Sequence, residues 1–171
     1  MAIALLTATA LALAGFLATS AGGFVLAATH GAAAGPLVTR HVAIAIPTVL
    51  ISLFSQSMVI FYFIGTGKLV KEEVASFPEA QRAVILRALR RFKAKTSPPA
   101  TFSLLSAIAV FVLGGGVHTS ALPGWTHLSA AILAVLTHAW ALSTEWRTFV
   151  ENHRLMNDPS VYVGAAQGAG D

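Results

Sequence analysis

Four of the six histidines in this chain lie beside the ends of long uncharged segments, where their side chains could bind a metal or a cofactor. Neutral imidazole is a common ligand of haem iron, zinc and copper. If the segments are antiparallel helices, the four rings gather at one end of the molecule. Two facing rings there could hold a haem b or a chlorin, whereas rings in interfacial positions would simply be solvated. The four residues are His30, His41, His118 and His127.

Three consecutive glycines come just before His118. Such a run weakens a helix and leaves a bare surface on it. Either a neighbouring helix packs closely against that surface, or a flat ring does, such as a porphyrin, a chlorin or a quinone. The run therefore favours His118, facing His41 or His127, as the ligand pair. The glycines are Gly114, Gly115 and Gly116.

His138 differs from these histidines because it lies in the middle of an uncharged segment. Eleven residues separate it from His127, and seven more reach Glu145, so a helix places all three in one line. Ionisable side chains inside a membrane are costly and face the interior of the bundle. This row of side chains has two interpretations. The first is functional, as a proton path or a quinone pocket, and the second is structural, as hydrogen bonds between helices. In the second case His138 would bond to Ser52 or Gln56 on a neighbouring polar stripe.

In the structural interpretation, Glu145 forms an ion pair with Arg147. Glu145 lies two residues before Arg147, near the end of its segment, and the two would pair at the cytoplasmic interface. Trp125 and Trp146 flank the same segment, and 21 residues of helix span about 31 Å. Because tryptophan favours both membrane interfaces, this pair is expected to mark the two edges of the membrane.

The uncharged segments are long enough to cross a membrane as helices. About 20 apolar residues span the hydrocarbon core, and backbone groups in lipid must find partners within their own segment. The chain is 56% hydrophobic and 11% charged. Because no Lys or Arg precedes Arg40, we expect the first segment to be a span and not a cleaved leader. The predicted fold is a single all-α membrane domain, residues 1–156, a four-helix bundle with spans at about 2–29, 42–66, 101–122 and 126–147.

Most of the basic residues lie in the connection between the second and third spans. The positive-inside rule places it in the cytoplasm of a bacterial-type inner membrane, and four spans then put both termini there. Apolar residues at helical spacing predict a basic amphipathic helix at about 77–95, ended by the prolines of 96–99. Its cations would contact anionic lipid or a partner subunit, or would only fix the orientation. They are Arg82, Arg87, Arg90, Arg91, Lys93 and Lys95, and the tail 157–171 is predicted to be flexible.

The two halves of the chain share a weak internal similarity. The segments His41–Ser52 and His127–His138 agree at the first histidine and at four of the following positions. Each segment opens the second helix of a hairpin. Matching hairpins would imply an approximate twofold axis along the membrane normal.

The motifs of common enzyme classes are missing from the sequence. There is no cysteine, which excludes disulfides and thiolate metal sites, and there is no HExxH motif. The segment 65–68 lacks the spacing of a phosphate-binding loop, and the placement of the basic residues indicates lipid contact and not nucleic acid. We therefore expect a non-enzymatic accessory or scaffolding subunit of a respiratory or photosynthetic membrane complex, in contact with other subunits or with itself. The alternatives are a haem-b or quinone-binding electron carrier, which the outer histidines favour, and a proton-coupled transporter using His138 and Glu145.

Single cysteines test the predicted topology, since the chain has none of its own. A cysteine at Arg87 in the basic connection should react with a membrane-impermeant maleimide only after the cells are permeabilised. A cysteine at Ala121, in the short connection after the third span, should react in intact cells. Labelling of the Arg87 position in intact cells would contradict the orientation.

Overall fold

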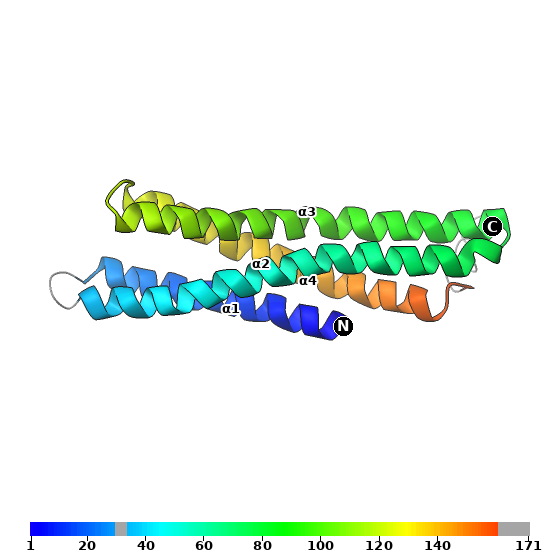
Figure 1. Ribbon diagram of the computed structural model, residues 1–171, viewed down its shortest axis with the longest axis horizontal. Helices are drawn as coiled ribbons and strands as arrows, with labels where there is room; N and C mark the ends of the chain where they lie inside the picture. Colours follow the sequence, from blue (N-terminus) through cyan, green and yellow to red (C-terminus); the bar gives the residue numbers. More distant parts are fainter. Residues whose placement is uncertain (30–33, 161–171) are drawn as a thin grey trace.

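The computed structural model describes residues 1–29 and 34–160, and within these ranges the chain is helical with no strand. Four long helices run back and forth along one axis (Figure 1). This confirms the all-α, four-helix prediction. The elements are α1 (Ala2–Ala27), α2 (Ala34–Glu73), the short 3-10 helix η2 (Val74–Ser76), α3 (Glu79–His118) and α4 (Gly124–Asn157). The predicted flexibility of the tail concerns residues that lie largely outside the described ranges.

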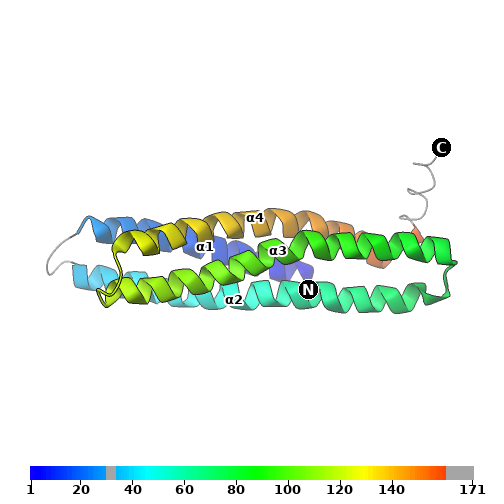
Figure 2. The ribbon, with the colours of Figure 1, turned by 90° about the horizontal axis from the view of Figure 1, so that it is seen from above.

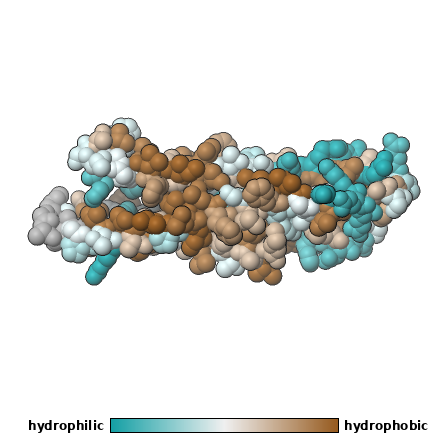
Figure 3. All heavy atoms as spheres, viewed as in Figure 1, coloured by the Kyte–Doolittle hydropathy of each residue, from teal (hydrophilic) through white to brown (hydrophobic). Residues whose placement is uncertain are grey.

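Each of the four helices is long and apolar enough to cross a membrane. Helices α2 and α3 have 40 residues each. At 1.5 Å per residue such a helix is about 60 Å long, roughly twice the thickness of a hydrocarbon core. The surface divides accordingly, with an apolar middle and a hydrophilic region at the end where α2 and α3 connect (Figure 3). The bundle is therefore longer than the membrane that it could span.

The helices are arranged in chain order around the bundle, so α1 packs on α2 and α4, and α3 packs on the same two helices from the other side (Figures 1 and 2). Helices α2 and α4 thus face each other across one diagonal. Helix α1 is the shortest, and its N-terminus lies about midway along α2 and α3 (Figure 1). The hydrophilic end is consequently built from three helices, α2, α3 and α4.

The expected break at 96–99 is wrong, because α3 runs without interruption through Pro98 and Pro99. A proline inside a helix removes one backbone hydrogen bond, but packing on the flanking turns compensates here. Pro99 is buried, and Thr96 Oγ1 donates to the carbonyl of Phe92 at 2.9 Å. The basic amphipathic segment is therefore the first half of α3 and not a separate helix.

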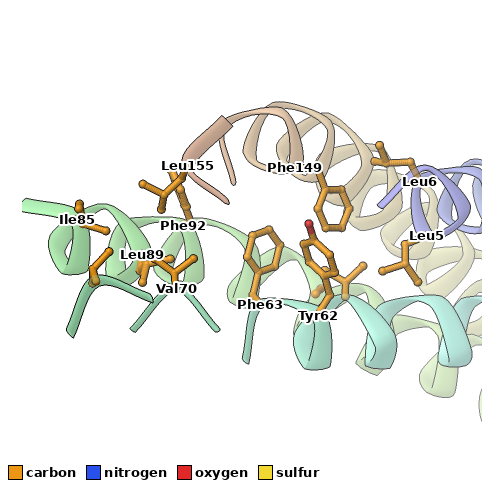
Figure 4. Packing of buried hydrophobic residues seen from close by; sticks show 13 residues of the cluster. Leu5, Leu6, Tyr62, Phe63, Val70, Ile85, Leu89, Phe92, Phe149 and Leu155 are labelled. Atoms are coloured by element: carbon orange, nitrogen blue, oxygen red, sulfur yellow. The ribbon is translucent and has the colours of Figure 1, made fainter. Parts of the chain in front are cut away.

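The apolar face of that segment packs inside the three-helix end and does not lie open to lipid. Ile85, Leu89 and Phe92 of α3 belong to one buried cluster with Val70 of α2 and Leu155 of α4 (Figure 4). All are less than a tenth exposed. The helical spacing of these apolar residues is thus explained by their packing against two neighbouring helices, α2 and α4.

Facing positions of α2 and α4 keep a constant register along the whole diagonal. The contacts His41–His127, Ser52–His138, Phe63–Phe149 and Thr66–Asn152 each join residues 86 positions apart. Helices α2 and α4 run in the same direction, so a constant separation of 86 residues means that the two helices stay in step along their length. The same offset relates the two similar segments that begin at His41 and His127. The two hairpins are therefore related as expected for an approximate twofold axis between α2 and α4.

Phe149 is the centre of the aromatic packing in this diagonal. Its ring stacks on Phe63 with centroids 5.2 Å apart and planes at 7°, and it meets Tyr62 edge-on at 4.8 Å (Figure 4). We predict that Phe149→Ala lowers the free energy of unfolding in detergent by about 3–4 kcal/mol, because it leaves a cavity in a close-packed core. Chemical or thermal unfolding followed by circular dichroism measures this loss.

Phe111→Ala is the matched control, since Phe111 is 55% exposed on the apolar surface of α3. It should change the unfolding free energy by less than about 0.5 kcal/mol. Equal losses in the two variants would contradict the packing described above.

Candidate functional site

His41 and His127 face each other across the diagonal near the end where α1 joins α2 and α3 joins α4. Their ring centroids are 6.1 Å apart and their planes stand at 81°. Helix α2 begins at Ala34, so His41 lies two turns inside it, whereas His127 lies in the first turn of α4. Both rings are partly buried. The structure therefore brings two of the four outer histidines together.

The backbone of the neighbouring helix holds the His127 ring. His127 Nδ1 lies 3.1 Å from the carbonyl oxygen of Val110 on α3. With Nδ1–H as the donor, Nε2 is left with a free lone pair. The His41 ring lies near the backbone of Thr19 on α1, and its Nδ1 is buried without a hydrogen-bond partner among the described residues. His127 thus uses one nitrogen for orientation and leaves the other for a ligand, as metal-binding histidines commonly do.

Glycines lie directly against both rings. A Cβ added to Gly114 on α3 would lie 2.9 Å from His127 Cε1, which is too close for an ordinary contact. Gly22 and Gly23 on α1 approach His41 in the equivalent place, at 3.8 and 3.5 Å from the added Cβ. Small residues thus make room for the imidazole on each side of the bundle. Of the predicted glycine run only Gly114 borders a histidine.

The other two glycines of the run have different surroundings. Gly115 has nothing within 4 Å of an added Cβ, and Gly116 packs against Leu122. His118 ends α3 in an exposed position, and the described ring contact joins His41 to His127, so a ligand role for His118 stays a prediction. His30 lies outside the described residues. Within the described part of the chain no three His, Asp or Glu side chains lie close enough to hold a metal ion together.

His138 is fully buried and makes two hydrogen bonds. Its Nδ1 lies 2.7 Å from the carbonyl oxygen of Ala134, and its Nε2 lies 2.5 Å from Ser52 Oγ on the facing helix. With Nδ1–H donating to the carbonyl, Nε2 accepts from the serine hydroxyl, so the neutral ring is satisfied on both sides. Phe16 of α1 covers the ring, with centroids 4.6 Å apart. This is the interhelical bond to the polar stripe that the sequence suggested as one alternative.

Glu145 joins three helices at the next polar level. Its Oε2 accepts from Thr9 Oγ1 on α1 at 3.0 Å, and Thr9 Oγ1 accepts from Gln56 Nε2 on α2 at 3.2 Å. All three side chains are fully buried. The expected ion pair with Arg147 is wrong: two residues along a helix turn the side chain by about 200°, so Arg147 points to the exposed outer face. Glu145 Oε1 and Gln56 Oε1 are buried without a described partner.

One polar level was not predicted from the sequence. Asn152 is fully buried, and its Nδ2 donates to Tyr62 OH at 3.2 Å and to Thr66 Oγ1 at 3.4 Å. Asn152 follows Glu145 by seven residues, as Glu145 follows His138, so the helical period alone could have identified it. Thr9 was also missed, since a single threonine in an apolar segment carries little signal.

The polar residues form separate levels and not one continuous chain. The levels of His127, His138, Glu145 and Asn152 are spaced along α4 by about 10–16 Å, which exceeds the length of a hydrogen bond. No hydrogen bond among the described side chains joins one level to the next. The arrangement therefore ties the helices together, and a proton path through His138 and Glu145 stays a prediction.

Comparisons with known proteins add no assignment: no protein-family model, no curated protein and no solved structure matches this sequence.

The surroundings of Gly114 give a test of the histidine packing. We predict that Gly114→Ala lowers the free energy of unfolding by about 1–3 kcal/mol, because the added methyl group displaces His127 from a close-packed position. Gly115→Ala is the control, and it should raise stability by up to about 1 kcal/mol, since alanine is the better helix former and has open space there. Thermal unfolding in detergent compares the two, and an equal gain in both variants would contradict the contact.

Proposed function

We propose that this chain is a membrane-embedded electron-transfer subunit of a larger energy-transducing assembly, with a haem-b-type group bound between His41 and His127. The observation that carries the proposal is the facing pair of imidazoles, of which His127 is oriented by the carbonyl of Val110 and His41 has a buried Nδ1 without a partner among the described residues. Bundle cores commonly hold cofactors between side chains on facing helices.

The spacing of the two rings is compatible with their binding one metal ion. Nitrogen ligands lie about 2.0–2.1 Å from a bound metal, so two rings that bind one ion have centroids at most about 6 Å apart. The observed separation is 6.1 Å. The glycines beside the rings, with no side chain of their own, leave room for both imidazoles at the same level. His41 and His127 would hold the haem-b-type group, which would supply one-electron redox chemistry when bound.

The chain's own residues would orient the group and keep water from it. The contact with the carbonyl of Val110 fixes the orientation of the His127 ring, which is what a ligand must retain between redox states. Phe16, Val49 and Ala134 belong to the apolar cluster on the interior side of the site. These residues would separate a bound group from the polar levels deeper in the bundle.

The basic end supports the orientation in a bacterial-type inner membrane. By the positive-inside rule the three-helix end is cytoplasmic, so both termini lie on the cytoplasmic side and the histidine pair lies near the opposite face. Arg91 is engaged with Glu151 at 3.5 Å. The remaining cations of the α3 segment are available for anionic lipid or a partner subunit, namely Arg82, Arg87, Arg90, Lys93 and Lys95.

A second candidate is an accessory subunit without a cofactor, the function that the sequence favoured. The hydrogen bonds Ser52–His138 and Thr9–Glu145 support it, because they give these buried side chains a structural use. A proton-coupled transporter draws on the same residues but has less support, since His138 uses both ring nitrogens in hydrogen bonds.

A reduced-minus-oxidised absorption spectrum of the gently purified protein tests the proposal. We expect a haem b band in the wild type that disappears in His41→Ala and in His127→Ala, because each variant removes one axial ligand. His118→Ala is the control and should retain the band, since His118 lies exposed outside the pair. Size-exclusion chromatography checks that each variant remains folded.

A wild-type protein that is colourless after expression with added haem would contradict the cofactor proposal. If that colourless protein also copurifies with a membrane complex, the accessory-subunit candidate is supported instead. A band that survives both histidine substitutions would show that the group is bound elsewhere.

A further inference from the structure

A groove with a volume of about 300 Å³ lies on the outer surface between α3 and α4, far from the histidine pair. Its lining combines two cations, hydroxyl groups and one indole ring. This composition is unlike the apolar surface that covers the middle of the bundle (Figure 3). The lining residues are Lys95, Trp140, Ser143, Thr144, Arg147 and Thr148.

The register of the two antiparallel helices places the cations opposite each other. Arg91 pairs with Glu151 on one side of the groove at 3.5 Å. On the other side the rings of Phe102 and Trp140 meet with centroids 6.2 Å apart. Lys95 lies between these contacts on α3, and Arg147 lies at the same level on α4.

The two cations have no acidic partner in the parts of the chain that the structure describes. The one ion pair on this part of the surface joins Arg91 to Glu151. Glu145, only two residues from Arg147, points into the bundle, where it accepts from Thr9. The groove therefore carries an uncompensated positive charge, and a guanidinium beside an ammonium group is well suited to a phosphate.

An apolar strip continues from the groove toward the middle of the bundle. It consists of Phe102, Leu133, Leu136 and Trp140, which are 54%, 51%, 61% and 46% exposed. Trp140 belongs to both regions, with its indole at the junction between the polar groove and the strip. A free phosphate ion would use only the polar half of this surface, whereas a phospholipid would use both halves.

We propose that this groove binds the headgroup of an anionic phospholipid, with the phosphate between Lys95 and Arg147. One acyl chain lies along the strip of Phe102, Leu136 and Leu133. Basic pockets between membrane helices on the cytoplasmic side bind anionic headgroups in this manner. The inference is independent of the histidine pair and requires only that the bundle lies in a membrane.

Fluorescence quenching of Trp140 tests the proposal in reconstituted full-length protein. A background with Trp125→Phe and Trp146→Phe leaves Trp140 as the reporter. The vesicles contain phosphatidylcholine with a small fraction of either phosphatidylglycerol or phosphatidylcholine carrying brominated acyl chains. We expect brominated phosphatidylglycerol to bind about 30-fold more tightly than brominated phosphatidylcholine, since each basic side chain near anionic lipid gives roughly a fivefold gain.

The variant Lys95→Gln/Arg147→Gln should bring this preference close to one. The variant Arg82→Gln/Arg87→Gln is the matched control, because it removes the same charge from the same end of the bundle but outside the groove. Lys95→Arg/Arg147→Lys should restore the preference. Chromatographic behaviour and circular dichroism confirm that each variant is folded.

Three results would overturn the proposal. The first is equal quenching of Trp140 by brominated phosphatidylglycerol and brominated phosphatidylcholine at equal mole fraction, which would show no preference for the anionic lipid. Another is an equal loss of preference in the groove variant and the control, which would assign the effect to the general charge of the surface. The third is displacement of brominated phosphatidylglycerol by millimolar inorganic phosphate, which would make the groove a site for the free anion.

Discussion

The structure depends on the requirement that polar side chains in the interior of a membrane bundle find partners there, because lipid offers none. Along the α2–α4 diagonal this requirement is met at several levels, by Ser52 with His138 and by Thr66 with Asn152. Sliding either helix by one turn would leave all of these groups unpaired. The polar pairs therefore fix the axial register, which apolar contacts alone would leave loosely defined.

The same register explains why the outer histidines meet. His41 and His127 keep the offset of the deeper pairs, so the contacts that fix α2 against α4 also set the distance between the two rings. The helices at the sides contribute equivalent features, with Thr19 and Gly23 beside His41 and Val110 and Gly114 beside His127. The site is thus a product of the near-symmetry of the two hairpins.

Sequence patterns predicted the four helices, the gathering of histidines at one end and the link between His138 and the polar stripe of α2. These features follow from length, apolarity and helical period, which are local properties. Two predictions failed for a common reason. The break at Pro98 and Pro99 and the Glu145–Arg147 pair each depend on which neighbouring helix a side chain meets, and the sequence does not state that. The Asn152 level was recoverable from its spacing, whereas Thr9 was not.

Helix α1 contains no charged side chain from Ala2 to Ala27. No side chain of this helix can therefore anchor it by an ionic contact at a headgroup layer. Its depth depends instead on contacts inside the bundle, namely the hydrogen bond from the Thr9 hydroxyl to Glu145 and the close packing of Thr48 against Gly15. A change in the protonation or hydration of one buried carboxylate would consequently act on the vertical position of an entire helix.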